Sequence, residues 1–156
     1  MKTLFNYVFV ISILFAGCSL PDPELEEIKE LIESFVAAID RGDESLGRAC
    51  LLDESGFRLL NPNVDERTDG EEFTEVYLAE LIYNFRTIVD KYNGRNVEFA
   101  DFIIGDIWTQ HKGRRAFENS RIKIIVDGST VELPLKGIAK IEDKWKIIDL
   151  SGLEVN

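Results

Sequence analysis

The spacing of the apolar residues changes at Asn93-Gly94. In two long stretches between Leu25 and this point apolar residues recur every three or four positions, which is the period of an amphipathic helix. After it the chain is dense in β-branched and aromatic residues and is interrupted by short polar breaks, a pattern typical of strands joined by hairpins. Helices followed by a run of strands predict an α+β fold, with the N-terminal helices packed on one face of an antiparallel sheet.

The first half predicts two long helices and a shorter one between them. The first long helix begins near Leu25 and ends at Arg41-Gly42-Asp43, the short helix covers Glu44 to about Leu52, and the second long helix runs from about Glu71 to Tyr92. Residues 53–72 are polar and rich in turn formers. Glycine commonly ends a helix, so Arg41-Gly42-Asp43 is predicted to be a helix stop rather than an integrin-type adhesion motif.

The second half predicts four strands in one antiparallel sheet of four strands or more. The polar breaks between them have the composition of hairpin turns. The expected strands cover residues 97–110, 116–126, 130–141 and 145–150. Together with the helices they form a single predicted domain over residues 25–156.

The first residues have the pattern of a secretory signal. Lys2 is followed by the apolar run Leu4 to Gly17, whose 14 residues are too short to span a bilayer comfortably. The junction Leu14-Phe15-Ala16-Gly17-Cys18 resembles the lipobox of bacterial lipoproteins. The alternatives are a plain signal peptide with a chance cysteine and an uncut apolar anchor.

The lipobox resemblance implies both processing and location. Residues 1–17 would be removed, and Cys18 would become the acylated N-terminus, carrying palmitate-like chains in the membrane. Residues 18–24 would then form a short tether, since the prolines in it prevent helix and strand pairing. We therefore expect a membrane-anchored, extracytoplasmic protein. By analogy with enteric lipoproteins, Ser19 after the cysteine favours the outer membrane where a cell has one.

The chain is strongly acidic, which limits its partners. It holds 18 Lys and Arg against 29 Asp and Glu, a net charge of −11, and removing residues 1–17 with Lys2 gives about −12. No nucleic-acid partner is expected, because such a partner requires a basic surface. Of the two cysteines, a lipidated Cys18 leaves Cys50 without a partner. Apolar neighbours predict that Cys50 is a buried small side chain rather than a reactive thiol.

Two stretches carry a resemblance to a known superfamily. They are residues 35–46 (FVAAIDRGDESL) and the closing hairpin of residues 137–149 (GIAKIEDKWKIID). With helices first and a meander of strands after them, the chain resembles the nuclear transport factor 2-like superfamily, which includes ketosteroid-isomerase-like and SnoaL-like members of cystatin-like fold. The resemblance implies a cone-shaped single domain whose curved sheet wraps a pocket. It does not imply one function, because the superfamily mixes enzymes, binding modules and assembly domains.

The same resemblance argues against ketosteroid isomerisation. The phenol of those enzymes falls at Phe35, their base at Asn61 and their second oxyanion acid at Lys136, and none of these side chains can perform the required step. A different active site would have to use other polar groups. The candidates are Asp101, Asp106, Tyr77 and Asp149.

Metal and cofactor sites are not expected. Residues 61–72 come near a calcium loop, but Glu66 stands where the sharp turn needs glycine, so a solvated acidic loop is the preferred interpretation. His111 is the only histidine and sits in a predicted turn, where a surface role is more common than catalysis. A structural zinc site requires four Cys or His ligands, and the mature chain has fewer such residues than that.

Aromatic residues are numerous for one small domain. They can pack as core, or some can line a partly open apolar pocket. The candidate pocket residues are Phe35, Tyr77, Phe85, Phe99 and Trp108. Our first hypothesis is therefore a non-catalytic domain that binds a small apolar ligand or an envelope protein, with a homodimer as one expected form. The alternatives are an enzyme of the same fold, an isomerase or a cyclase-like lyase, and an envelope-assembly domain that would need an exposed apolar patch on the outer sheet face.

Overall fold

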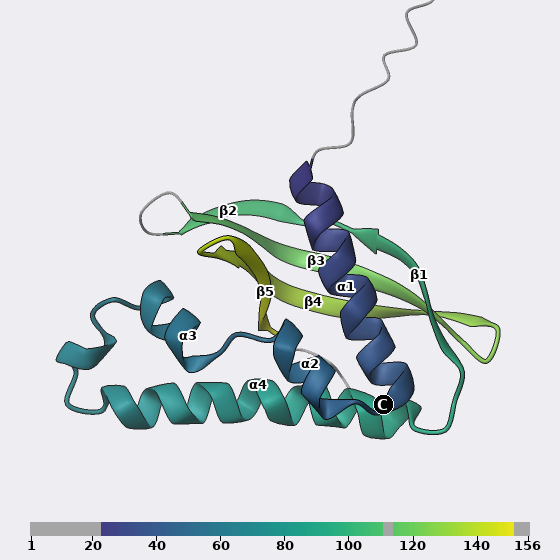
Figure 1. Cartoon of the computed structure of the whole chain (residues 1–156), viewed down its shortest axis with the longest axis horizontal. Coiled ribbons are helices and arrows are strands. Elements are labelled where there is room, and N and C mark those ends of the chain that lie inside the picture. Colours follow the sequence, from purple (N-terminus) through teal and green to yellow (C-terminus); the bar gives the residue numbers. More distant parts are fainter. Residues whose placement is uncertain (1–22, 111–113, 152–156) are drawn as a thin grey trace, which may run out of the picture.

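The structure is a computed structural model that describes residues 23–110 and 114–151. It confirms the predicted α+β class, because four α-helices pack on a five-stranded antiparallel sheet that does not close (Figure 1). The helices come first in the chain and the strands follow, with one shared hydrophobic core between the two layers. Cys18 lies outside the described residues, as do His111 and the other residues of its turn, 112–113.

Helix α1 covers Pro23–Arg41 and crosses the face of the sheet (Figure 1). It begins two residues before the predicted start, because proline fits the first turn of a helix, where its missing N–H is not needed. Pro23 and Glu24 therefore belong to the helix and not to the tether. The helix ends where predicted, with Gly42 at φ 61°. Its buried stripe consists of Ile28, Ile32, Phe35, Val36, Ala38 and Ile39.

Two short helices follow, each with an aspartate cap. Helix α2 covers Glu44–Cys50, and the Asp43 carboxylate accepts the backbone N–H of Leu46 at 3.0 Å. Helix α3 covers Glu54–Leu60, and Asp53 accepts the N–H of Gly56 at 2.8 Å. The sequence predicts α2 but not α3, which spans seven residues of a polar stretch and buries few of them. A 3₁₀ turn at Val64–Glu66 completes this region.

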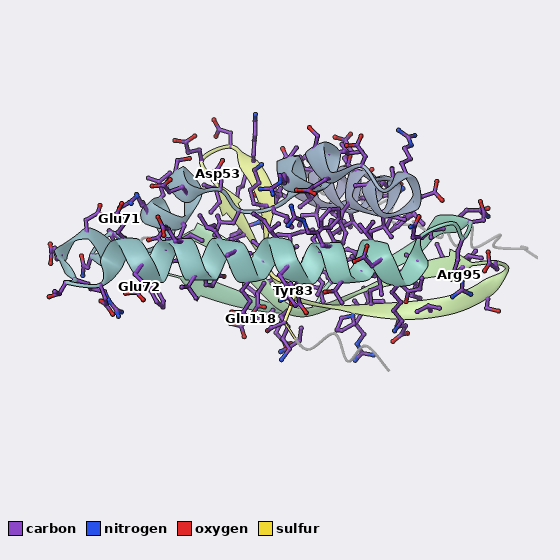
Figure 2. The ribbon with its side chains drawn as sticks, turned by 90° about the horizontal axis from the view of Figure 1, so that it is seen from below. Asp53, Glu71, Glu72, Tyr83, Arg95 and Glu118 are labelled. Carbon is purple, nitrogen blue, oxygen red and sulfur yellow. The ribbon has the colours of Figure 1, made fainter. Side chains whose placement is uncertain are left out.

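Helix α4 covers Gly70–Tyr92, within one residue of the prediction. Figure 2 views it from outside, with Glu71 and Glu72 in its first turn and Arg95 just beyond its end. Acids at the start of a helix and bases near its end complement the helix dipole. Tyr83, labelled halfway along, is 68% exposed, so this side of α4 faces solvent.

The strands are β1 (Val97–Ile103), β2 (Asp106–Gln110), β3 (Arg114–Val126), β4 (Ser129–Ile141) and β5 (Lys144–Asp149). Their order is β1-β3-β4-β5, and β2 also pairs with β3 on the side of β1. The first predicted strand, residues 97–110, is therefore two strands. Strand β5 forms the other edge of the sheet.

The break between β1 and β2 is a sharp bend shared with β3. A Cβ at Gly105 would lie 1.8 Å from the carbonyl oxygen of Glu118, so only glycine lets the two backbones approach this closely. Opposite it, Asn119 adopts φ 55°. The hydroxyl of Ser120, which is buried, accepts the N–H of Gly105 at 3.0 Å. These local contacts bend the sheet.

None of the helices in the described part of the chain is both long and apolar enough to cross a membrane. The buried residues of α1 and α4 are turned to the shared core, and charged residues lie on their outward faces, where α4 also exposes Phe73, Val76 and Tyr83.

Candidate functional site

Two of the five predicted pocket residues lie in a closed core. Phe35 of α1 is 0% exposed and Phe85 of α4 is 1% exposed, and their ring centroids are 5.6 Å apart. Both side chains are packed between the helices and the sheet, out of contact with solvent. In this conformation they contribute to stability and cannot touch a ligand that enters from outside.

The third residue, Tyr77, lies beside a small cleft of about 120 Å³ between α4 and the end of β5. Its ring packs against Phe57 at 4.9 Å, and its hydroxyl donates to the carbonyl of Ile148. Burial, with the negative charges of Asp149 and Glu80, raises the pKa of Tyr77 to about 12. Because this phenol is neutral and is already hydrogen-bonded to the backbone, it stabilises the fold.

Phe99 and Trp108 lie on the other edge of the sheet. Phe99 is a half-buried residue of β1 that packs against the core. Trp108 belongs to β2, where its backbone pairs with Ala116, and its side chain is outside the described part of the structure. The structure thus joins Phe35 with Phe85 but does not bring all five aromatic residues around one described cavity.

A groove of about 330 Å³ lies on the opposite edge of the sheet, between α1, α2 and the β4–β5 hairpin. We call it the α1–β5 groove. Leu31 of α1 and Leu46 of α2 form its half-buried apolar sides. Ala49 is exposed at its mouth, and Cys50 is buried beneath. The groove is lined by Glu27, Glu30, Leu31, Ser34, Leu46, Ala49, Cys50, Asp143, Lys144, Trp145 and Lys146.

Trp145 of β5 is the most informative residue of this groove. Its side chain is 4% exposed and stacks near Phe117, with ring centroids 5.6 Å apart. Its indole N–H is buried and has no hydrogen-bond acceptor among the described residues, where it is the one buried side-chain N or O atom in this condition. Buried donors are nearly always paired, so this N–H is the polar atom of a groove residue for which the described chain supplies no partner.

Charges surround the groove unevenly. Lys140 donates to Glu27 at 3.1 Å, and this bond raises the pKa of the lysine. Lys146 donates to the backbone carbonyl of Ala49 and so ties β5 to α2. Within the described chain, Glu30 on the α1 side and Lys144 on the β5 side form no ion pair. These two side chains are available to a ligand.

Cys50 behaves as predicted from its apolar neighbours. It is buried, and its thiol donates to the carbonyl of Leu31 at a sulfur–oxygen distance of 3.9 Å. Burial raises the pKa of the thiol to about 11, so it is almost wholly protonated at neutral pH.

A larger hollow, of about 410 Å³, lies on the outer face of the sheet, the face turned away from the helices. It is lined mainly by polar side chains of β3 and β4, and Arg121 and Glu132 within it pair with each other at 3.6 Å. Two residues further along β3, Lys123 lies opposite Asp101 of β1, and its Nζ is 4.0 Å from the Asp101 carboxylate. These two cross-strand ion pairs make this part of the outer face polar, although Ile103, the register partner of Arg121, is 39% exposed beside them.

The other candidate residues are dispersed. Asp101 is on the outer face, Asp106 begins β2, and only Tyr77 and Asp149 share a cavity. Asp149 accepts the N–H of Ser151 at 2.7 Å, so both members of that pair are held by the backbone.

The positions aligned with isomerase chemistry do not form a site either. Phe35 is in the core, Asn61 donates to the carbonyl of Phe57 at the end of α3, and Lys136 is exposed on β4. Across the described residues, no three His, Cys, Asp or Glu side chains are grouped so that they could hold a metal ion.

Sequence reasoning missed the α1–β5 groove. Trp145 stands in the closing hairpin that carries the superfamily resemblance, yet its sequence context is that of a core aromatic. The unpaired indole and the open strand edge depend on how α1 and α2 pack beside β5, and the periodicity of the sequence does not specify that packing.

Comparisons with family models, with curated proteins and with solved structures found no match to this chain. The function therefore has to be inferred from the geometry and the sequence.

Proposed function

We propose that this protein is a lipid-anchored, extracytoplasmic lipoprotein whose folded domain binds a partner or ligand without changing it chemically, and that the α1–β5 groove is the binding site. The observation that carries this proposal is the unpaired, buried indole N–H of Trp145 beside an apolar groove. A hydrogen-bond donor in that position gives direction to binding, and the leucine sides give apolar contact.

The interior of the domain is a less suitable site than the groove. Phe35 and Phe85 fill the space between α1 and α4, so a ligand there would have to displace packed aromatic rings. Removing a phenylalanine from a core typically costs about 3–5 kcal/mol, and a displaced ring loses much of the same contact. The groove requires no such rearrangement.

Binding is favoured over catalysis by the state of the polar groups. Catalytic groups converge on a reacting atom and have shifted pKa values that suit proton transfer near neutral pH. The pKa of Tyr77, one of the candidates, is raised away from neutrality to about 12. Its hydroxyl proton is also engaged in the hydrogen bond to the carbonyl of Ile148.

The anchor would place the groove close to the membrane. Five residue steps separate Cys18 from Pro23, and at up to about 3.6 Å per residue they reach at most about 18 Å. Glu27, on the groove, is only one helical turn beyond Pro23. The binding site would therefore lie near the bilayer surface, where it can meet other envelope components.

Mass spectrometry of the protein extracted from its own membranes tests the anchor. We expect a mature N-terminus at Cys18 carrying acyl chains, and a Cys18→Ser variant that is neither processed at this position nor membrane-bound. An unmodified product that starts at another residue would contradict the lipoprotein proposal.

Native mass spectrometry of the same material tests the groove. Ala49→Trp places an indole at the exposed mouth of the groove, and Lys136→Trp makes the matched change on the outer face. We expect a bound component on the wild type and on Lys136→Trp, and its loss from Ala49→Trp. A component retained equally by all three proteins would place binding elsewhere.

A further inference from the structure

We propose that the α1–β5 groove takes an extended peptide segment of a partner protein, which pairs with the free edge of β5 and carries an apolar side chain and a basic one. This inference rests on the proposed function, because it names the partner of the same groove. It is carried by the direction of the β5 backbone, by the polar groups beside it and by the charges on the groove.

The backbone of β5 offers an unused edge at Trp145. The carbonyl of Ile147 accepts the N–H of Leu52 at 2.9 Å, so the polar groups of Ile147 point away from β4. In an antiparallel pair, residues two apart point their N–H and C=O to the same edge. The backbone groups of Trp145 therefore point off this edge too, next to the groove that Trp145 lines.

The chain itself already uses this edge once. Leu51 forms an isolated parallel bridge with Ile147, so the segment at Leu51 already pairs with this edge, although it forms no strand of its own. Towards Trp145 the bridge ends where helix α2 ends, at Cys50, and the edge from Trp145 to the turn has no strand on it in the described structure. An added peptide would continue a pairing that the fold has begun, in the manner of strand addition at a sheet edge.

The groove also offers contacts for side chains. A peptide on this edge would lie beside the half-buried Leu31 and Leu46, which can receive one apolar side chain. The unpaired indole N–H of Trp145 would find an acceptor in a peptide carbonyl after a small movement of the ring. A small apolar molecule would satisfy the leucines but would leave the strand edge unpaired, which is why we favour a peptide.

Charge favours a basic segment. Glu30 and Asp143 line the groove without an ion pair in the described chain, as does Lys144 on the β5 side, and the whole protein carries a net charge of −11. A negative field of this size attracts positively charged partners and repels acidic ones. We therefore expect lysine or arginine next to the apolar side chain of the peptide, facing Glu30.

A random peptide library displayed on phage tests this proposal on the folded wild-type protein. We expect selected peptides that share an aliphatic residue beside a basic one. Synthetic copies should bind the wild type, and methylation of the central peptide nitrogen should weaken binding at least about tenfold, since it removes a strand hydrogen bond. Trp145→Phe should weaken binding several-fold, and Glu30→Gln should do so mainly for the basic peptides.

Two variants separate the edges of the sheet. Ala49→Trp should abolish peptide binding, whereas Ile107→Glu, at a residue 72% exposed on β2 at the opposite edge, should leave it unchanged. Thermal unfolding followed by circular dichroism is the measurement that checks whether both variants are folded. Selection of no peptide, binding unaffected by Ala49→Trp, or tolerance of the nitrogen methyl group would each overturn the peptide proposal. A non-peptide component lost from Ala49→Trp in native mass spectrometry would leave the proposed function standing while this inference fails.

Discussion

The hydroxyl of Tyr77 in α4 donates a hydrogen bond to the carbonyl of Ile148 in β5, 71 residues further along the chain. The bond joins the longest helix to the edge strand of the sheet. The ring of Tyr77 also packs against Phe57 of α3, so one side chain connects α3, α4 and β5. The same phenol that was a candidate for catalysis is a structural link.

Replacing Tyr77 with phenylalanine should lower the free energy of unfolding by about 1–2 kcal/mol at neutral pH, because it leaves the Ile148 carbonyl without its donor. The ring contacts remain, so the fold should be retained. Urea unfolding followed by circular dichroism measures the difference. Tyr83→Phe, at an exposed position on the same helix, is the control and should change stability by less than about 0.5 kcal/mol.

The contribution of Tyr77 should disappear at alkaline pH. Its pKa is raised from 10.0 to about 12, so the folded state favours the neutral phenol. A raised pKa gives stability that is fully present below pH 10 and is lost as the pH rises to about 12. The gap in stability between wild type and Tyr77→Phe should therefore narrow over this interval, and a gap that widens would contradict the assignment.

Gly47→Ala should destabilise the protein although alanine is the better helix former. A Cβ at Gly47 would lie 2.1 Å from the ring of Phe85, which is buried and cannot move freely. Overpacking of this kind costs about 1–3 kcal/mol, against a helix-propensity gain of about 1 kcal/mol. Thermal unfolding measures the net loss. In a Phe85→Leu background the same change should become neutral or stabilising, and Ser45→Ala in the same helix should be nearly neutral.

Glu44 should titrate far below an ordinary glutamate. Hydrogen bonds first from Arg86 and then from Arg48 lower the pKa of its carboxyl from 4.5 to about 2. Carboxyl-carbon NMR chemical shifts, compared between wild type and Glu44→Gln to assign the signal, measure the midpoint. Because the folded pKa is depressed, the contribution is present above pH 4.5 and is lost as the pH falls towards 2. A midpoint near 4.5 would mean that the two arginines do not hold the carboxylate in solution.

Cys50 should be nearly unreactive in the folded protein. Its thiol pKa of about 11 is two units above the ordinary value of 9.0, which lowers the thiolate fraction about 100-fold near pH 8. In a Cys18→Ser background, reaction with a disulfide reagent should be slow until denaturant is added. Ala49→Cys in a Cys50→Ser background provides an exposed thiol one residue away, which should react quickly.

Several parts of the fold could be predicted from the sequence because they rest on local periodicity. The stripe of α1 from Ile28 on, the stripe of α4 from Leu81 to Tyr92, the stop at Gly42 and the positions of the β3–β4 and β4–β5 turns all have signals within a few residues. Phe73 and Val76, which the period also predicts to face the core, are exposed. The buried state of Cys50 was likewise predicted from its neighbours. These features need no knowledge of the tertiary structure.

The parts that were missed depend on contacts between distant segments. Helix α3 is too short to show a period, and Phe57 is buried only because α4 and the sheet lie over it. The bend at Gly105 is set by the backbone of β3 opposite, and residues 97–110 are rich in β-branched and aromatic residues on both sides of it, so their composition gives no sign of the break.

The candidate pocket illustrates the same limit. Phe35 and Tyr77 both look like residues that could face a ligand, but their exposure is decided by how α1 and α4 approach the sheet. The open edge at Trp145 follows from where α2 ends, at Cys50, and from the bridge of Leu51 to Ile147. No property of residues 144–149 alone distinguishes a covered edge from a free one.

The bend at Gly105 and Asn119 divides the thirteen residues of β3 into two segments that pair with different strands. On one side of Asn119, β3 pairs with β1, and on the other side it pairs with β2. Because β1 and β2 share no ladder, β2 can open without breaking the hydrogen bonds of β1. Amide hydrogen exchange should therefore show two separate units along this edge, with the short β2 unit exchanging first while β1 stays protected together with α1.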